Sequence, residues 1–231
     1  MSEHNLVIVF AIFPGVTQLD FTGPHQVFSA LPGAEVIVAS TEGGAIDSGG
    51  LTFAGLKRLN DIPHCDVICV PGGRGATDDA MHDAVFLREL RRLASGARYV
   101  TSVCTGALVL GAAGLLRGKR ATTHWAWHAQ LALFGAIPDK GRVVRDGNVI
   151  TGGGVTAGID FALSVVAELF DAETAQAIQL GIEYAPAPPF DAGSPETAPP
   201  DILERVRQRN APSTKLRQAS IERAAARLAA G

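Results

Sequence analysis

The chain changes character at Cys104, in the middle of the stretch Tyr99-Val100-Thr101-Ser102-Val103-Cys104-Thr105-Gly106-Ala107-Leu108-Val109-Leu110. The residues before the cysteine predict a short buried strand, and the small and apolar residues after it predict a helix. A strand that passes directly into a helix needs a tight turn, which lifts the side chain at the turn out of the sheet. Cys104 is therefore a candidate nucleophile at the end of a strand.

Cys104 can be interpreted either as a reactive thiol or as a buried structural residue. Unpaired backbone N–H groups at the start of the following helix favour the thiolate, which is the reactive form of the side chain. Free cysteine is also among the most frequently buried residue types, so the alternative is a small apolar residue that fills the sheet.

The rest of the chain alternates apolar strands with helices. Further strands are expected at residues 6–12, 35–40 and 66–70, and a hairpin at 142–145 and 149–151. Helices are expected from Pro24 toward Leu31, over 83–95, after Cys104 up to Leu116, and over 127–134, 156–170 and 172–183. This alternation predicts an α/β fold with a doubly wound, mostly parallel, flavodoxin-like sheet and helices on both faces. Ligands of such sheets bind at the carboxyl ends of the strands.

The composition is that of an ordinary globular protein. The chain has 231 residues, of which 47% are hydrophobic and 19% charged, and its formal net charge is -3. This length supports one large core or at most two small domains, and the acidic balance indicates neither nucleic acid nor an anionic membrane surface as partner. The amino-terminal residues lack the positive region of a secretory signal, and no apolar run approaches the roughly 20 residues that span a bilayer. We expect a cytoplasmic protein.

The three cysteines, at positions 65, 69 and 104, do not form a disulfide framework. Cys65 and Cys69 also lack the paired Cys/His spacing of a zinc site. We therefore expect them to pack in the sheet and no metal to bind there.

Composition divides the chain into residues 1–184, which carry the α/β pattern, and residues 185–231. The second region begins with a proline-rich connection and continues as a helical tail with seven basic residues, at positions 205, 207, 209, 215, 217, 223 and 227. A basic amphipathic tail is more often a solvated face or an oligomerisation arm than a nucleic-acid site. We expect it to pack on the domain or on a dimer partner.

Several polar or flexible residues are expected at the strand ends near Cys104. Asp20 has apolar neighbours, which raise the pKa of a carboxyl and suit it to proton transfer, although it could also cap the helix expected at Pro24. Gly72 and Gly73 end a strand where backbone N–H groups can stabilise a developing negative charge, or simply form a turn. His124 is a candidate base, although a lone histidine is more often structural.

The glycine-rich stretch from Gly152 to Gly158 matches neither the phosphate-binding loop nor the dinucleotide fingerprint. This stretch, which includes Val155 and Thr156, is interpreted as a close-packed turn before a helix, with backbone groups near the thiol. The sequence thus gives no sign of a nucleotide cofactor.

Six motifs together resemble the PfpI-like branch of the class I glutamine amidotransferase-like superfamily, and within it the isocyanide hydratases. They are Gln18–Pro24, Val70–Gly73, Thr101–Gly106, Ala121–Trp125, Gly152–Asp160 and Glu183–Phe190. The motifs around Cys104 and Gly152–Asp160 also occur in transcription regulators of the superfamily. Asp20 and the carboxyl-terminal third favour the hydratases.

The resemblance implies that Cys104 is the nucleophile and Asp20 the acid/base carboxylate, with Thr105 beside the nucleophile and Val155 near the sulfur. Protease-like members have a histidine directly after the cysteine, whereas this chain has Thr105. It further implies a homodimer that converts a small isocyanide to a formamide without metal or organic cofactor. Three further functions stay open: a ligand-binding regulatory module, a glyoxalase-like stress enzyme that uses the same thiol, and a redox sensor.

Overall fold

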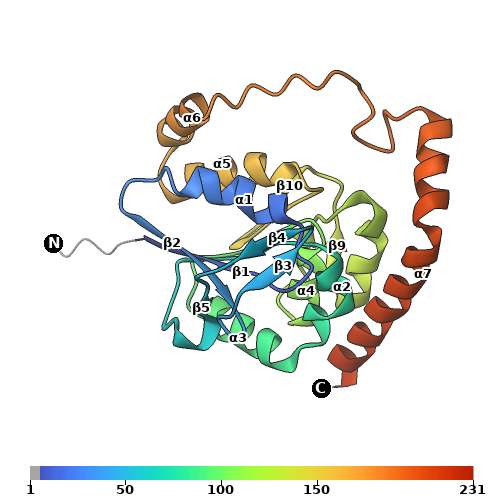
Figure 1. Ribbon diagram of the computed structural model, residues 1–231, viewed down its shortest axis with the longest axis horizontal. Coiled ribbons are helices and arrows are strands. Elements are labelled where there is room, and N and C mark those ends of the chain that lie inside the picture. Colours follow the sequence, from blue (N-terminus) through green and yellow to red (C-terminus); the bar gives the residue numbers. More distant parts are fainter. Residues whose placement is uncertain (1–5, 231) are drawn as a thin grey trace.

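The computed structural model describes residues 6–230. Its core is a seven-stranded sheet in the order β10-β11-β7-β6-β1-β2-β5, parallel throughout except between β10 and β11 (Figure 1). The strands are β1 (Leu6–Ala11), β2 (Ala34–Ser40), β5 (Lys57–Arg58), β6 (Val67–Val70), β7 (Tyr99–Val103), β10 (Val143–Asp146) and β11 (Val149–Gly152). The predicted doubly wound, mostly parallel sheet is confirmed.

Two short strand pairs lie outside this sheet. One is the hairpin β3 (Ile46–Ser48) and β4 (Leu51–Phe53), and the other joins β8 (Arg120–Ala121) to β9 (Ile137–Pro138) in parallel. The hairpin falls within the glycine-rich stretch between β2 and β5, where glycines accommodate tight turns at positive φ.

Helices cover both faces of the sheet. On one face lie α1 (Gln18–Phe28), α5 (Ala157–Leu169) and α6 (Ala172–Gly181), and on the other α2 (Arg74–Asp78), α3 (Ala84–Ala94) and α4 (Gly106–Ala112) (Figure 1). Three 3-10 helices complete the layers: η1 (Leu59–Asp61), η2 (Ala80–His82) and η3 (Trp125–Phe134). Because both faces are covered, central strands such as β6 are buried along their whole length.

The first helix begins earlier than the sequence predicts. The pattern placed Pro24 at the first helical position, whereas α1 begins at Gln18 and contains Pro24 in its interior. A proline there removes one intrahelical hydrogen bond, but its ring packs against α5, where a Cβ on Gly158 would meet the Pro24 ring at 3.0 Å. Tertiary packing thus outweighs the local preference, and Asp20 lies in the first turn of α1 rather than in a loop.

Two other helix predictions were wrong in detail. The helix after Cys104 ends at Ala112, and Gly114 follows with φ of 77° instead of a continuation to Leu116. Residues 125–134 form the 3-10 helix η3. The sequence does not distinguish these cases, because both helix types accept the same apolar spacing over two or three turns.

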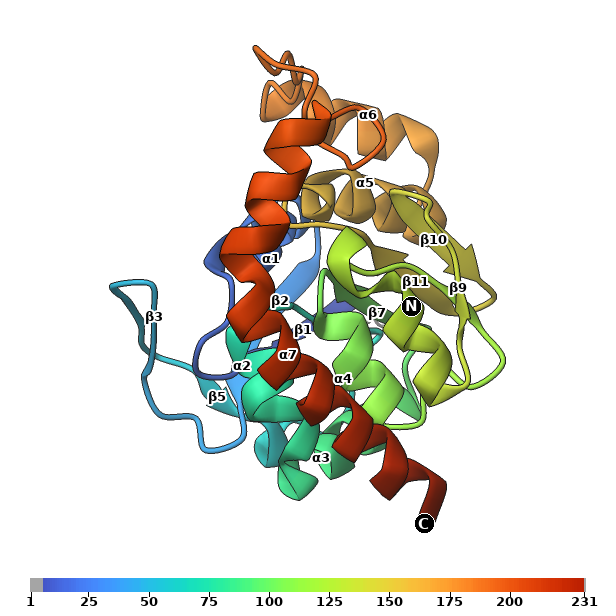
Figure 2. The same cartoon turned by 90° about the vertical axis from the view of Figure 1, so that its right-hand side faces the viewer.

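The basic tail is one long helix, α7 (Pro200–Ala230), which crosses the domain over α2 and α4 (Figure 2). Its carboxyl-terminal half is docked by the buried residues Ser220, Ile221 and Ala224. The Ser220 hydroxyl donates to the carbonyl of Thr77 at 2.7 Å and lies 2.6 Å from Nε2 of His82. Within residues 6–230, no helix has the length and apolarity that a membrane crossing requires.

Candidate active site

Cys104 occupies the sharp turn between β7 and α4. Its φ is 57°, in the left-handed region that residues other than glycine rarely adopt. Backbone hydrogen bonds hold this conformation, since the Cys104 N–H donates to the carbonyls of Gly152 at 3.0 Å and Gly153 at 2.8 Å. The Thr123 hydroxyl donates to the Cys104 carbonyl at 2.8 Å. The predicted strand-to-helix turn is confirmed, with its backbone fixed from two sides.

Asp20 meets the cysteine from the end of the sheet. The side chain is fully buried, and Oδ2 accepts a hydrogen bond from the Gly72 N–H at 2.9 Å. Among residues 6–230, no nitrogen or oxygen atom donates to Oδ1. The carboxyl interacts with the Cys104 thiol instead, and this contact affects the acidity of both groups. The segments that follow β1, β6 and β7 therefore bring Asp20, Gly72 and Cys104 together, as the sequence predicts.

The two acidic groups share a dry environment. Burial raises the pKa of Asp20 to about 7, although hydrogen bonds from Gly72 and Cys104 lower it in part. Burial, the negative charge of Asp20 and the hydrogen bond with Asp20 raise the pKa of the Cys104 thiol well above its ordinary value, against the effect of the Thr105 N–H. The pair thus releases one proton near neutral pH and holds the second strongly, so that a single negative charge is shared between sulfur and carboxyl.

The start of α4 does not determine the protonation of Cys104. The sequence placed the sulfur at a helix N-terminus that favours the thiolate, but α4 is short and Cys104 is only 5% exposed. Burial and the neighbouring carboxyl oppose thiolate formation more strongly than the backbone N–H groups support it. Transfer of the thiol proton to Asp20 removes the carboxylate charge and thereby favours the thiolate.

Gly72 and Gly73 are packed against the site. A Cβ on Gly72 would lie 2.5 Å from the Thr105 nitrogen and 2.8 Å from Asp20 Oδ2, so no larger residue fits. The Gly73 N–H donates to the Thr105 hydroxyl at 2.9 Å, and that hydroxyl donates to the Gly73 carbonyl at 3.2 Å. Both glycine N–H groups are thus bonded to side chains of the site, and their contact with a reacting molecule stays a prediction.

The turn before α5 forms one wall of a cavity of about 810 Å³. Val155 and Thr156 line it together with His124 and the segment 193–196 of the proline-rich connection. Thr123 and Gly153, which hydrogen-bond to the Cys104 backbone, lie in the same wall. Contact between the Val155 amide and the sulfur stays a prediction. Burial lowers the pKa of His124, with nearby positive charge adding to the effect, which leaves the ring neutral at physiological pH.

A second polar network braces this turn and was not predicted. Arg142 donates to Oδ2 of Asp160 from Nε at 2.9 Å and from Nη2 at 2.7 Å, and the Tyr184 hydroxyl donates to the same oxygen at 2.9 Å. Nη2 also reaches the Thr156 hydroxyl at 3.4 Å. Asp160 belongs to the motif Gly152–Asp160, but its partners lie on other elements and give no local signal.

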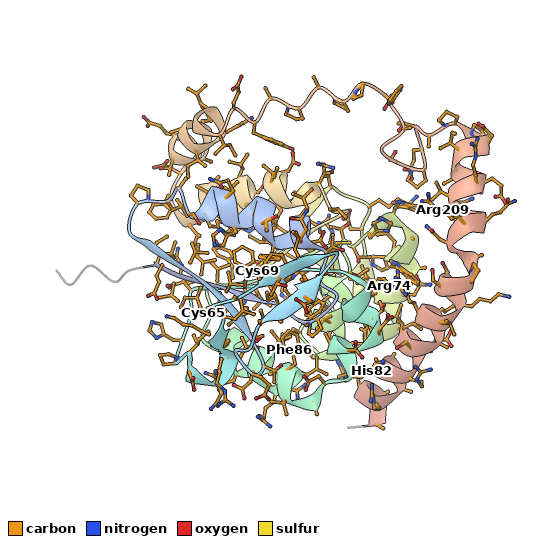
Figure 3. All side chains as sticks on the ribbon, viewed as in Figure 1. Cys65, Cys69, Arg74, His82, Phe86 and Arg209 are labelled. Atoms are coloured by element: carbon orange, nitrogen blue, oxygen red, sulfur yellow. The ribbon has the colours of Figure 1, made fainter. Side chains whose placement is uncertain are left out.

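The other two cysteines have no part in this arrangement. Cys65 and Cys69 are buried in and beside the sheet, where burial raises the pKa of each thiol to about 12 (Figure 3). Among the described residues, neither thiol is hydrogen-bonded to a carboxyl that could take its proton, as Cys104 is to Asp20, so we expect both to be unreactive at neutral pH. Within residues 6–230, no three side chains of the metal-ligating types come together.

The model of the DJ-1/PfpI family matches residues 7–168. The chain belongs to the DJ-1/PfpI family. Within this DJ-1/PfpI family, a crystal structure of a ThiJ/PfpI protein from Pseudomonas syringae superposes with a TM-score of 0.90 at 42% identity and covers 96% of this chain and 90% of that one.

Two curated relatives match over much of their length. The isonitrile hydratase of Pseudomonas putida is 56% identical over 224 residues, which cover 96% of this chain and 98% of the relative. The dj-1beta protein of Drosophila melanogaster is 29% identical over 190 residues, which cover 80% of this chain and 99% of the relative. The first match therefore includes the proline-rich connection and α7, which lie beyond the part covered by the family model.

Proposed function

We propose that this protein is an isocyanide hydratase, which adds water to an isocyanide, R–N≡C, and releases the formamide R–NH–CHO. The observation that carries this proposal is the buried Asp20–Cys104 pair, which places a thiol nucleophile beside a carboxyl that can take up and return its proton. The isonitrile hydratase of P. putida, whose name uses a synonym for isocyanide, supports the substrate class through its 56% identity.

In the first step, the Cys104 thiolate attacks the terminal carbon of the isocyanide and forms a carbon–sulfur bond. The same carbon then takes the proton of the Asp20 carboxylic acid. The product is a thioimidate, R–N=CH–S–Cys104, beside an Asp20 carboxylate. This step uses the pair in its one-proton state, with the proton on the carboxyl and the negative charge on the sulfur.

In the second step, the Asp20 carboxylate accepts a proton from a water molecule that attacks the thioimidate carbon, and returns this proton to the nitrogen. The resulting carbon bears OH, NH–R and the sulfur. It loses the hydroxyl proton to Asp20 as the carbon–sulfur bond breaks, which releases the formamide and restores the thiolate beside a protonated Asp20. One water molecule is consumed and no other reactant is needed.

The remaining site residues have positioning roles in this proposal. Gly72 holds the Asp20 carboxyl, and Gly73 holds Thr105 beside the nucleophile. The turn before α5 accepts the Cys104 N–H at Gly152 and Gly153, and Val155 and Thr156 line the neighbouring cavity, which we propose as the route of the substrate to Cys104.

The test is incubation of the purified protein with phenyl isocyanide and with cyclohexyl isocyanide, followed by mass spectrometry. We expect both formamides, and with H₂¹⁸O as solvent we expect ¹⁸O in the formyl group. No formamide from either compound at neutral pH would contradict the proposal. Incubation with methylglyoxal tests for a glyoxalase-like enzyme, since lactate would then form in place of a formamide.

A redox sensor and a DNA-binding regulator both find less support in the site. A redox sensor needs a thiol that is exposed to the oxidant, whereas Cys104 is buried. A DNA-binding regulator needs further helix-turn-helix units, whereas residues 200–230 form the single helix α7.

We further infer a cytoplasmic homodimer, organised as an α/β domain of residues 1–184 with an appended segment of residues 185–231. The exposed face of α7 supports this inference, because it leaves apolar residues uncovered, such as Ile202 at 38% exposure and Leu216 at 75%. Truncation at Pro200 is expected to change the oligomeric state, measured as the mass of the particle by light scattering. An unchanged oligomeric state would leave α7 as an intramolecular cover for its own domain.

A further inference from the structure

A second cavity lies beside the first, between η3 and the amino-terminal half of α7. It encloses about 740 Å³, and its charged lining residues are all basic: Arg74, Arg207, Lys215 and Arg217. Figure 3 shows Arg74 on the side of the domain that faces α7. We call this cavity the basic groove. Its charge contrasts with the net charge of -3 of the whole chain.

The basic side chains of this groove are available to a ligand. Ten Lys or Arg side chains form ion pairs within residues 6–230, and none of the four groove cations is among them. Unpaired like charges repel one another, so their convergence favours binding of an anion. The Arg217 charge also lowers the pKa of His124, which places this arginine near the boundary between the two cavities.

The lining of the basic groove also includes aromatic side chains. Trp125 and Trp127, which are the two tryptophans of the chain, line the basic groove together with His124. The His124 and Trp125 rings are 5.4 Å apart between centroids and inclined by 35°. A planar ligand with a negative group meets both an aromatic surface and the arginine forks that pair with carboxylates.

The basic groove adjoins the cavity whose wall includes the residues that hold the Cys104 backbone, although Cys104 itself lines neither cavity. The basic groove shares His124, Trp125 and Arg207 with the cavity that Thr123 and Gly153 line. Arg74 directly follows Gly73, whose N–H donates to the Thr105 hydroxyl. Among residues 6–230, Glu196 is the only carboxylate that lines the first cavity, and it pairs with Lys140 at 3.3 Å, so the shared residue Arg207 keeps its positive charge.

We propose that the basic groove binds an anionic substituent of the substrate, so that the preferred isocyanides are aromatic compounds that carry a carboxylate or a similar group. The isocyano carbon then meets Cys104, and the anion lies among Arg74, Arg207 and Arg217. This inference rests on the proposed hydratase function and specifies its substrate class.

The kinetic test compares 4-isocyanobenzoate with its methyl ester, which has the same ring and no charge. We expect the wild-type protein to have a kcat/KM for the acid at least about ten-fold above that for the ester, which corresponds to one charge-assisted hydrogen bond. The double variant Arg207→Gln/Arg217→Gln is expected to abolish this preference. Arg209→Gln removes the same charge from an exposed position of α7 outside the groove and is expected to keep it (Figure 3).

A binding test does not depend on turnover. In the Cys104→Ala variant, benzoate is expected to change the tryptophan fluorescence saturably, whereas uncharged benzamide is not. The change is expected to disappear when Arg207→Gln/Arg217→Gln is added, and to weaken as salt is raised. Equal responses to benzoate with and without the two arginines, or equal kcat/KM values for acid and ester in the wild type, would overturn the inference. If neither isocyanide reacts, the hydratase function fails, and the fluorescence titration still decides the anion site.

Discussion

The Gly72 N–H and Asp20 Oδ2 are 2.9 Å apart, although the two residues are 52 positions apart in the chain. A single backbone donor at the end of β6 thus fixes the carboxyl that interacts with the Cys104 thiol. The absence of a side chain on Gly72 allows this approach, because a Cβ there would lie 2.8 Å from the same oxygen.

Gly72→Ala is therefore expected to displace Asp20 and to destabilise the fold by about 1–3 kcal/mol, the usual effect of overpacking. The value of kcat should fall even under conditions where the variant is fully folded, because the proton carrier leaves its position. Denaturant unfolding and kcat measure the two effects. Gly96→Ala is the matched control, since no atom lies within 4 Å of a Cβ at that position. A Gly72→Ala variant with normal kcat would contradict the role of this glycine.

Asp20→Asn is expected to stabilise the protein at pH 8 and to leave it unchanged at pH 4. The folded state raises the pKa of Asp20 from 3.8 to about 7, so the folded protein binds a proton that the unfolded chain releases between these values. The wild type therefore loses stability as pH rises from about 4 to 7, by up to about 4 kcal/mol at about 1.4 kcal/mol per pKa unit, and the asparagine variant does not. Thermal unfolding across pH measures the difference, with exposed Asp191→Asn as control. Parallel pH profiles for wild type and Asp20→Asn would be evidence against a buried proton on this carboxyl.

The same substitution is expected to lower the pKa of the Cys104 thiol, because it removes the negative charge that opposes the thiolate. The rate of alkylation by iodoacetamide as a function of pH reports this pKa. Turnover is expected to be lost despite the more available thiolate, since asparagine cannot deliver a proton. Asp20→Glu should retain part of the turnover. Wild-type single-turnover rates in Asp20→Asn would exclude an acid/base role for Asp20.

Cys104→Ser and Cys104→Ala are expected to reduce turnover by about three orders of magnitude or more while the fold is retained. Cys65→Ala and Cys69→Ala should keep turnover and lower stability only, because both thiols are buried with a pKa of about 12. Circular dichroism and kcat separate the two effects. Loss of activity in a folded Cys69→Ala variant would show that a second thiol takes part.

Ser220→Ala is expected to loosen α7 without unfolding the sheet. The substitution removes the hydroxyl that donates to Thr77 and lies against His82, and leaves a buried carbonyl without this partner. The cost is about 1–3 kcal/mol. Amide hydrogen exchange should accelerate in residues 200–230 and stay unchanged in β6 and β7, whereas the exposed control Gln218→Ala should change neither.

Much of the fold could be predicted from local patterns. The apolar runs of β1 and β6 and the turn at Cys104 are each visible within a few residues, and the rule for parallel sheets then places Asp20 and Cys104 at one edge. The start of α1 and the helix type of η3 could not be predicted, because packing against α5 and α4 decides them.

The finer parts of the site depend on contacts distant in sequence. The resemblance pointed to Asp20 and Cys104, but nothing local indicates that the Gly72 N–H is used to hold the carboxyl. The Arg142–Asp160–Tyr184 network and the convergence of Arg74 with Arg217 join residues that are far apart in the chain. Such groups appear only when the chain has folded.

The placement of α7 has a consequence for the order in which the protein acquires its properties. During synthesis every strand of the sheet leaves the ribosome before α7, and domains fold as their segments emerge. A nascent chain can therefore assemble the thiol and its proton carrier while one side of the basic groove is still unmade. The proposed catalytic pair can thus form on the ribosome before the proposed anion-binding groove, which is complete only when α7 docks through Ile221 and Ala224.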